Sequence, residues 1–283
     1  MAIDLHLHTT ASDGTFTPTQ LVQHAAKVGL KIISVTDHDT VGGVQEAIDA
    51  GKRVGIEVIP GIELGSDVSG QDIHILGYFI DHKSEWLLNF LESLKLIRLG
   101  RAEEILKKLA QYKIDIDLNE VLKLATGGIV TRAHIGQVVA KQGYVTSVRE
   151  AFDKYLGRDK PCYVVKYNYS AADVINAIKT ARGIPVLAHP AISKMDELIP
   201  SLVKEGLMGL EAIASDHSPS LIEHYKWIAK RFNLIVTGGS DDHGPRTPGR
   251  FLIGKVHVPD EIAQNLKEAV RVGGRAYGIE GSE

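Results

Sequence analysis

The sequence predicts an α/β fold in which βα units surround a mostly parallel sheet or barrel, with a helical domain inserted into it. Short apolar runs recur along the 283 residues, each followed by Gly, Asp, His or Ser and then by a segment of helical periodicity. One long stretch between two of these runs has helical periodicity only. Hydrophobic residues make up 44% of the chain, which is enough to bury the core of such a fold.

Seven apolar runs have the length and composition of buried strands, and a later run is a further candidate. Most are separated by a helical segment, as in βα units, so we expect most of the strands to be parallel. The seven runs are Ile3 to Leu7, Lys31 to Val35, Ile56 to Pro60, Ile73 to Phe79, Ile184 to Ala188, Gly209 to Ile213 and Leu234 to Thr237, and the later one is Phe251 to Val258.

Helical periodicity fills most of the gaps between these runs. The first helix has a clear start, because Thr17, Pro18 and Gln20 suit the N-cap, N1 and N3 positions, and Gly29 suits its end. Similar helices are expected over Val41 to Gly51, Ala171 to Arg182, Lys194 to Glu205, Ser218 to Arg231 and Glu261 to Gly273.

Residues 84–157 break the alternation, because they contain helical segments and no convincing strand. We expect them to form an inserted helical domain that caps the substrate site, while 1–83 and 158–283 form the barrel. No Gly/Ser linker flanks the insert, so it should pack on the barrel. The expected helices cover roughly 84–111, 117–125, 131–142 and 147–156.

Composition excludes several classes of protein. Lys and Arg number 32 against 35 Asp and Glu, a net charge of -3 that argues against a binder of duplex DNA or of anionic membranes. The single cysteine, Cys162, excludes an intrachain disulfide and a Cys-rich metal site. Neither a basic and apolar leader nor a run of 18 apolar residues occurs, so we expect a cytoplasmic location. Histidine is in excess, with 12 residues against 6 Phe.

Two of these histidines, His6 and His8, lie in the first predicted strand. Strict alternation from Ile3 to His8 puts both imidazoles and Asp4 on one face of that strand. One strand can thereby supply two metal ligands, although a lone His-x-His is also compatible with a polar strand face.

Most of the further His, Asp and Glu residues lie at or after the ends of other predicted strands, and His74 lies within one. In a parallel barrel, residues after the strand ends converge on one face. Burying so many titratable groups without metal would leave them largely unpaired. Nitrogen and oxygen donors with no thiolate suit two or three divalent ions such as Mn, Fe or Zn, and Glu63 is the candidate to bridge two of them. The candidate ligands are His6, His8, Asp13, His38, Glu63, His74, His189, Asp241 and His243.

Taken together, these motifs resemble the PHP phosphoesterases, named for polymerase and histidinol phosphatase domains. The resemblance covers 1–80 and 160–283 and rests on His-x-His, Thr-Asp-His-Asp, Gly-Ile-Glu, Ala-His-Pro and Gly-Ser-Asp-x-His. It implies a distorted seven-stranded (β/α)7 barrel with a trinuclear metal site. The implied ligands are His6, His8, Glu63 and Asp241 for one ion, Glu63, His74 and His189 for a second, and Asp13, His38 and His243 for a third.

Such a site would hydrolyse a phosphate ester. Two bridged ions lower the pKa of a bound water and neutralise phosphoryl oxygens, so we expect a metal-activated hydroxide held through Glu63, His74 and His189. The third ion would bind the leaving oxygen or a non-bridging oxygen. Mn²⁺ is the expected metal, with Fe²⁺ or Zn²⁺ as alternatives. Asp37, Asp39 and Asp242 stand beside ligands and would either orient imidazoles or serve as turn and cap residues.

Substrate contacts are expected from the insert. Arg132 and His134 open a helix, where a guanidinium, an imidazole and free N–H groups suit a phosphate. Arg98 and Arg101 share a helix face and are either a second phosphate clamp or a solvated face. Further candidates are Arg158, Lys160 and His217, with Tyr163, Tyr167 and Tyr169 as residues that could flank a base.

Within the family, the insert and Asp13 resemble the branch that converts nucleoside 3′,5′-bisphosphates, such as adenosine 3′,5′-bisphosphate, to AMP and phosphate. Some members of that branch also trim short RNA from the 5′ end. The expected partner is therefore a small phosphorylated nucleotide or a short 5′-phosphorylated RNA, and the oligomeric state is left open.

Three alternatives remain. One is a histidinol-phosphate phosphatase or another small phosphomonoesterase. A second is an amidohydrolase-like barrel that cleaves C–N bonds, which also opens with His-x-His but commonly uses a bridging lysine where this chain has Glu63. The third is a metal-free interaction scaffold, which would have lost ligands, and none is lost here.

Overall fold

A seven-stranded sheet forms the centre of the computed structural model, which describes residues 2–68, 71–125, 127–165, 169–193, 196–245 and 251–276. Its strands follow one another in the order of the sequence. They are β1 (Ala2–Leu7), β2 (Leu30–Val35), β3 (Glu57–Val68), β4 (Gln71–Tyr78), β5 (Ile184–Leu187), β6 (Gly209–Ala214) and β7 (Ile235–Gly239).

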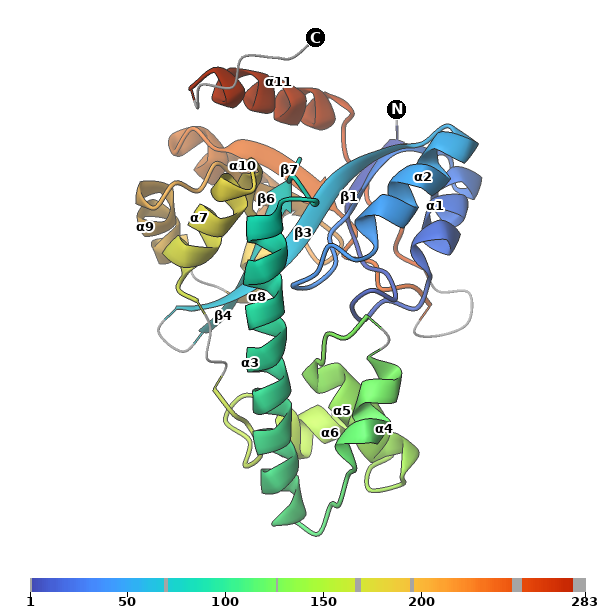
Figure 1. The fold of residues 1–283 in the computed structure, drawn as a ribbon. Coiled ribbons are helices and arrows are strands. Elements are labelled where there is room, and N and C mark those ends of the chain that lie inside the picture. The colour runs from blue at the N-terminus through green and yellow to red at the C-terminus, as the bar shows by residue number, and fades with distance from the viewer. Residues whose placement is uncertain are drawn as a thin grey trace.

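The two edge strands meet and nearly close the sheet into a barrel (Figure 1). His8 N donates to Asp242 O over 3.0 Å, and Asp241 N donates to His6 O over 2.9 Å. The α/β barrel predicted from the sequence is confirmed. The predicted late strand at 251–258 is wrong, because only Val258 pairs, through one isolated bridge to Ile3.

Strand β4 is the main distortion of the barrel. It pairs antiparallel with β3 on one side and with β5 on the other, whereas the remaining pairs are parallel. No helix separates β3 from β4, so β4 returns directly alongside β3. This pairing also extends β3 to Val68, well beyond the predicted end at Pro60. Glu63 therefore lies inside a long strand and not at its end.

Helices surround the barrel as predicted, with some different ends. Thr17 caps α1 through the expected capping box with Gln20. Of the predicted helix at 194–205, Lys194 and Met195 lie outside the described residues, and the described part begins with a 3₁₀ turn, η2 (Asp196–Leu198), before the helix α9 (Ile199–Lys204). The helices are α1 (Pro18–Lys27), α2 (Val44–Val54), α7 (Ala171–Thr180), α8 (Pro190–Ser193), α9 (Ile199–Lys204), α10 (Pro219–Arg231) and α11 (Glu261–Ala276).

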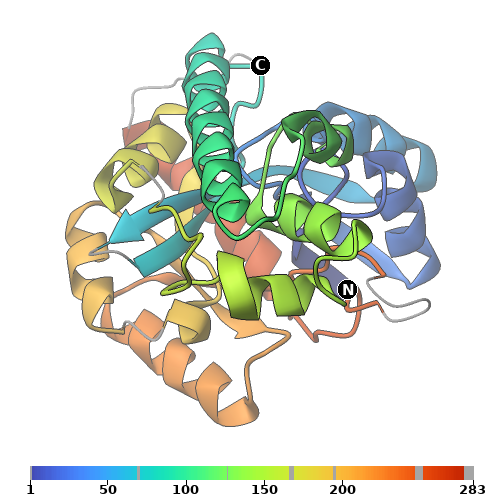
Figure 2. The same ribbon diagram turned by 90° about the horizontal axis from the view of Figure 1, so that it is seen from below.

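The four helical segments predicted between β4 and α7 are present. The first half of the long helix α3 packs into the main barrel core through Leu87 and Leu91, whereas a separate apolar cluster including Ile105 and Val139 joins its second half to the helices that follow. Figures 1 and 2 show most of these helices beyond one end of the barrel. The capping role of a domain at 84–157 stays a prediction. They are α3 (Glu85–Ala110), α4 (Leu118–Leu124), α5 (Arg132–Lys141), α6 (Val148–Ala151) and the π turn η1 (Phe152–Leu156).

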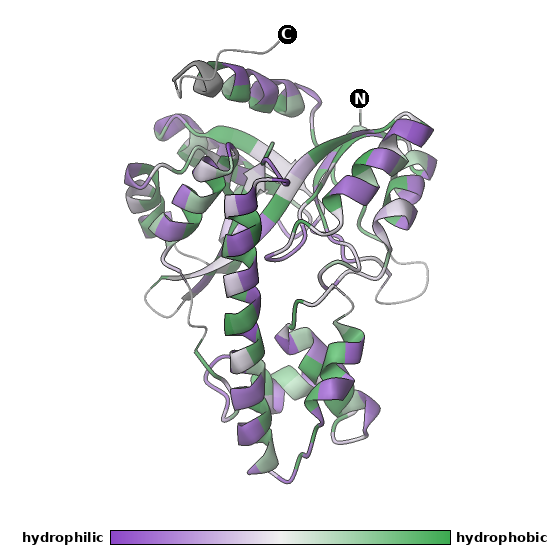
Figure 3. Cartoon of the chain, in the orientation of Figure 1, coloured by the Kyte–Doolittle hydropathy of each residue, from purple (hydrophilic) through white to green (hydrophobic). Residues whose placement is uncertain are grey.

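The two ends of the barrel differ in polarity. Leu5, Leu76 and Val186 belong to an apolar cluster that Ile262 and Leu266 of α11 complete, so one end is filled and covered. Figure 3 shows the alternating apolar and polar residues of α11. The other end is left for polar side chains. Within the described residues, no helix is both long and apolar enough to cross a membrane.

Candidate metal centre

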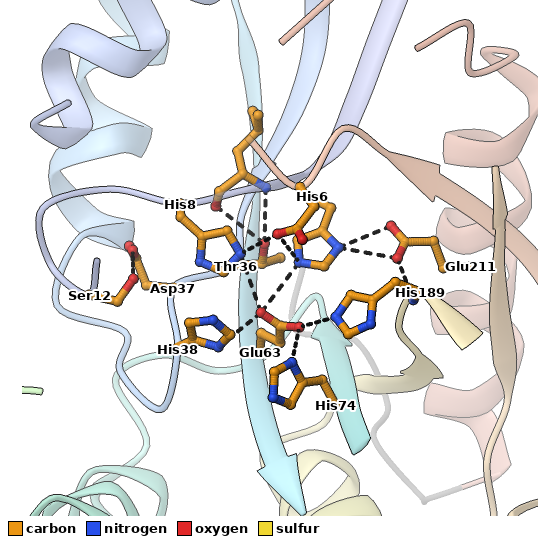
Figure 4. A network of polar contacts seen from close by, with 12 residues as sticks. His6, His8, Ser12, Thr36, Asp37, His38, Glu63, His74, His189 and Glu211 are labelled. Carbon is orange, nitrogen blue, oxygen red and sulfur yellow. Dashed lines mark hydrogen bonds and ion pairs between the residues drawn. The ribbon is translucent and has the colours of Figure 1, made fainter. Parts of the chain in front are cut away.

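Glu63 lies at the centre of the polar end of the barrel, surrounded by imidazoles (Figure 4). Its Oε1 is 2.9 Å from His74 Nδ1 and 3.0 Å from His189 Nε2. Its Oε2 is 3.0 Å from His38 Nδ1, 3.3 Å from His8 Nε2 and 3.4 Å from His6 Nε2. One buried carboxylate thus contacts an imidazole from each of five places in the chain.

The antiparallel direction of β4 explains how His74 reaches this end. His74 is the fourth of the eight residues of β4. Because β4 is reversed, His74 pairs with Gly65 of β3 and lies beside Glu63.

The remaining predicted ligands complete the cluster. Asp241 Oδ1 is 3.1 Å from His8 Nε2, and His243 Nε2 is 3.5 Å from Asp13 Oδ1. The rings of His8 and His243 stack at 4.0 Å. All nine candidate ligands are therefore gathered at one end of the barrel.

Three groups of these side chains have ligand atoms within 4.8 Å of one another. They are His6, His8, Glu63 and Asp241; His8, Asp13, His38 and His243; and His38, Glu63 and His74. The first group is the set that the resemblance implies for one ion. The second group is the set implied for another ion with His8 added, and the third has His38 in the place of His189.

The donor atoms fit divalent ions. Within the described residues, buried atoms such as His6 Nε2, His8 Nε2 and Glu63 Oε2 lie close together without making hydrogen bonds. Leaving such atoms buried and unpaired is costly, and a cation placed between them would use their lone pairs. Imidazole and carboxylate donors without thiolate suit metals of intermediate hardness.

The pKa shifts follow from burial and from the close carboxylates. Burial lowers the pKa of His74, and burial together with His8 lowers that of His243 to about 4. Burial opposes protonation of His8 too, but Asp241 and Glu63 raise its pKa to about 10. Despite burial, the surrounding imidazoles hold the pKa of Glu63 well below its usual range. A cation would replace the proton on His8, so metal binding should release protons.

Glu211 is a site residue that the sequence prediction missed. Its two carboxylate oxygens lie 3.0 and 3.2 Å from His6 Nδ1, and Oε2 accepts from His189 N over 2.8 Å. Glu211 thus leaves His6 Nε2 to face the centre. The available signal was a lone carboxylate inside the apolar run from Gly209 to Ala214.

Asp37 and Asp242 act as turn and cap residues. The alternative was that they orient imidazoles. Asp37 accepts from Thr9 N over 2.7 Å and from Ser12 Oγ over 2.6 Å, and so holds the loop that carries Asp13. Asp242 Oδ1 accepts from Leu252 N over 3.0 Å.

Arg98 and Arg101 differ in their surroundings. Arg98 forms a buried ion pair with Asp39, whose Oδ1 also accepts from Gly65 N over 3.1 Å. Arg101 is buried, and its Nε donates to Val164 O over 3.0 Å. In the described structure its Nη2 has no hydrogen-bond partner. The alternative prediction, that this pair lies on a solvated helix face, is therefore wrong.

Arg132 lies beside Arg101. Its guanidinium is over the ring of Tyr163, as is that of Arg101, and its Nη2 is 3.4 Å from Asp72 Oδ2. Burial and the charge of Arg132 lower the pKa of Arg101 to about 10. His134 uses Nδ1 to accept from Thr131 N over 3.3 Å, which closes the cap of α5.

The other candidates are scattered. Arg158 and Lys160 are exposed. His217 has its Nδ1 2.9 Å from Ala212 O and stacks on a tyrosine of α10. Tyr169 packs on Phe90, away from Tyr163, and Tyr167 lies outside the described residues. Of the two described tyrosines, Tyr169 thus packs on an aromatic ring and Tyr163 on two guanidiniums.

A family model described as the PHP domain matches residues 4–160. The chain belongs to the PHP domain family. The match includes the helical segment that the motifs left out. As a PHP protein, the chain is a metal-dependent phosphoesterase.

Relatives of this PHP protein agree with that class. It is 36% identical to a 5′-3′ exoribonuclease of Haemophilus influenzae, over 86% of this chain and 90% of that one. It is 32% identical to a 3′,5′-nucleoside bisphosphate phosphatase of Chromobacterium violaceum, over 88% and 89% of the two chains. A solved structure from Bifidobacterium adolescentis, described as a metal-dependent phosphoesterase, superposes with a TM-score of 0.84 at 30% identity, covering 93% and 94%.

Proposed function

We propose that this phosphoesterase removes the 3′-phosphate from nucleoside 3′,5′-bisphosphates and trims short RNA from the 5′ end. The observation that carries the proposal is the position of two kinds of unsatisfied group at one end of the barrel. Among the described residues, several buried ligand atoms of the Glu63 cluster lack hydrogen-bond partners, and so does Nη2 of the buried Arg101. A substrate with two phosphates would meet both. The names of two relatives, an exoribonuclease and a bisphosphate phosphatase, support the same class of substrate.

The proposed cofactors are two or three divalent ions, with Mn²⁺ first and Fe²⁺ or Zn²⁺ as alternatives. Glu63, His74 and His189 would hold the ions nearest the attacking water, and Asp13, His38 and His243 an ion near the leaving oxygen. When bound, the ions would activate water and neutralise the phosphoryl oxygens. Glu211 would keep His6 in the tautomer and orientation that ligation needs.

The second phosphate would bind at Arg101 and Arg132. Both guanidiniums lie over Tyr163, and their mutual repulsion favours an anion between them. Arg101 Nη2 offers a buried donor, which makes a charge-assisted bond to a phosphate oxygen strong. Arg98 would act mainly by fixing α3 on the barrel through Asp39.

The substrate can be tested directly. With Mn²⁺ present, release of phosphate or nucleotide is measured for adenosine 3′,5′-bisphosphate, histidinol phosphate and a short 5′-phosphorylated RNA. We expect cleavage of the first and third. Cleavage of histidinol phosphate alone would replace the proposed substrate class by the histidinol-phosphate alternative.

The phosphate role of Arg132 gives a second test. Arg132→Ala should raise KM for the bisphosphate about 10-fold, since a charge-assisted hydrogen bond contributes about 1.5 kcal/mol or more. Bound metal, measured by elemental analysis, should not change. Arg149→Ala, at an exposed arginine that follows α5, is the matched control. A normal KM for Arg132→Ala would remove this residue from the substrate site.

A further inference from the structure

A pocket of about 420 Å³ lies between the loop that follows β2 and helix α3. Asp39 forms part of its lining, together with Gln45, Leu88, Leu91, Lys83 and Lys95. Apart from Asp39, none of these residues has been placed in the site above, and the pocket is large enough for a ligand of nucleotide size.

The walls of the pocket combine apolar and cationic side chains. Leu88 and Leu91 give an apolar wall, and Lys83 and Lys95 contribute two ammonium groups. Lys95 is 3.5 Å from Glu92, but both side chains are substantially exposed and such a pair is weak, so the ammonium group can turn to an anion. A flat nucleobase would pack on the apolar wall, and a phosphate would bind the two ammonium groups.

The pocket adjoins the metal centre through Asp39. This residue directly follows His38, and its N donates to Glu63 O over 2.9 Å. Its carboxylate holds Arg98 of α3. Lys95 and Arg101 are three residues before and after Arg98, so at 100° per residue they lie on opposite flanks of Arg98. The pocket and the Arg101–Arg132 pair are thus on opposite sides of the Arg98–Asp39 ion pair.

We propose that this pocket holds the second nucleotide of an RNA that is trimmed from its 5′ end. The inference rests on the proposed function. With the 5′-phosphate at Arg101 and Arg132 and the next phosphate at the Glu63 cluster, the rest of the strand must continue on the far side. The base of the second nucleotide would lie along Leu88 and Leu91, and the following phosphate near Lys83 and Lys95.

The reaction explains why this nucleotide matters for repeated cleavage. Water adds to the phosphorus as the bond from phosphorus to the 3′ oxygen breaks, and that oxygen leaves with a proton as part of the first nucleotide. The phosphate stays on the 5′ oxygen of the second nucleotide. The shortened strand therefore carries a new 5′-phosphate, which Arg101 and Arg132 can bind next. A nucleoside 3′,5′-bisphosphate has no second nucleotide and leaves the pocket empty.

The test compares a nucleoside 3′,5′-bisphosphate with a 5′-phosphorylated trinucleotide of the same first base. The double variant Lys83→Ala/Lys95→Ala should lose about 10-fold in kcat/KM for first cleavage of the trinucleotide and keep its rate on the bisphosphate. Leu88→Trp, at a largely exposed position, should narrow the pocket and give the same split. Lys107→Ala, an exposed lysine farther along α3, is the control and should change neither rate.

The outcomes separate the two proposals. If the unaltered protein cleaves neither substrate, the proposed function fails and the pocket proposal falls with it. If it cleaves the bisphosphate but not the trinucleotide, removal of the 3′-phosphate stands as the proposed function, and RNA trimming falls together with the pocket proposal. Equal effects of the pocket variants on both substrates, or no effect on either, would also overturn it.

Discussion

At the scale of single residues, the metal centre depends on which nitrogen of each imidazole is already used. His6 Nδ1 is held by Glu211, so His6 Nε2 faces Glu63 and Asp241. His243 Nδ1 lies 3.0 Å from Asp241 O, so His243 Nε2 faces Asp13. A group that fixes the tautomer of a metal-ligating histidine commonly affects metal affinity nearly as much as the ligand itself does.

Glu211→Gln should therefore weaken divalent metal binding by about 10- to 100-fold. The amide leaves the volume of the side chain almost unchanged but removes the negative charge next to His6. Affinity is measured by titrating Mn²⁺ into metal-free protein and following heat. Glu57→Gln, at an exposed glutamate that pairs with Lys267, serves as control. Equal affinities for the two variants would contradict a positioning role for Glu211.

The sequence pointed to the candidate ligands that the structure brings together, but not to Glu211, which orients one of them. His6 and His8 follow from two-residue alternation along one strand, which is a local property. Glu211 contacts His6 across 205 positions of the chain. Only the closed barrel brings them together, so no local pattern could have paired them.

At the scale of elements, the connection between α4 and α5 fixes the loop that carries Asp13. Gly127 lies so close to Ala11 that a Cβ added to it would overlap the backbone of Ala11. The same loop is held from the barrel side by Asp37. One candidate ligand is thus positioned jointly by the barrel and by the inserted helices.

Gly127→Ala should lower the free energy of unfolding by about 1–3 kcal/mol, because a methyl group must be accommodated against backbone. Urea unfolding measures this change, and elemental analysis should show less bound metal. Gly100→Ala is the matched control, since a Cβ there meets nothing within 4 Å and the position is inside helix α3. That variant should gain about 0.5–1 kcal/mol. A gain in both variants would contradict the close contact.

The pattern of apolar runs in the sequence does not predict the direction of β4. The apolar runs at 56–60 and 73–79 indicate two strands but not their relative direction. Pairing over the intervening residues extends β3 and reverses β4, and that pairing is decided between strands. His74 was therefore predicted as a ligand without any prediction of the direction of its strand, which the pairing with β3 decides.

At the scale of the whole molecule, the barrel has one apolar end, covered by α11, and one end crowded with ionisable groups. Without cations, five imidazoles share one carboxylate in a buried space. Ions that bind the folded chain and not the unfolded chain stabilise folding by mass action.

Removal of metal should therefore lower Tm by at least about 5 °C, since each site occupied at 100 times its Kd adds about 2.7 kcal/mol. Thermal unfolding is followed with excess EDTA, and again after Mn²⁺ is restored. EDTA saturated beforehand with Mn²⁺ controls for the chelator itself. Elemental analysis without chelator should find more than one divalent ion per chain. An unchanged Tm together with no bound metal would contradict the metal centre.

The closure of β1 against β7 also determines when the centre can exist during synthesis. His6 and His8 leave the ribosome more than 230 residues before Asp241 and His243. Because domains fold as units, His6 and His8 could share an ion with Asp241 only after β7 has been synthesised. Divalent ions differ in their raw affinity for isolated histidines, copper above the rest. A metal site that is completed only after β7 has been made would let the finished geometry choose the ion.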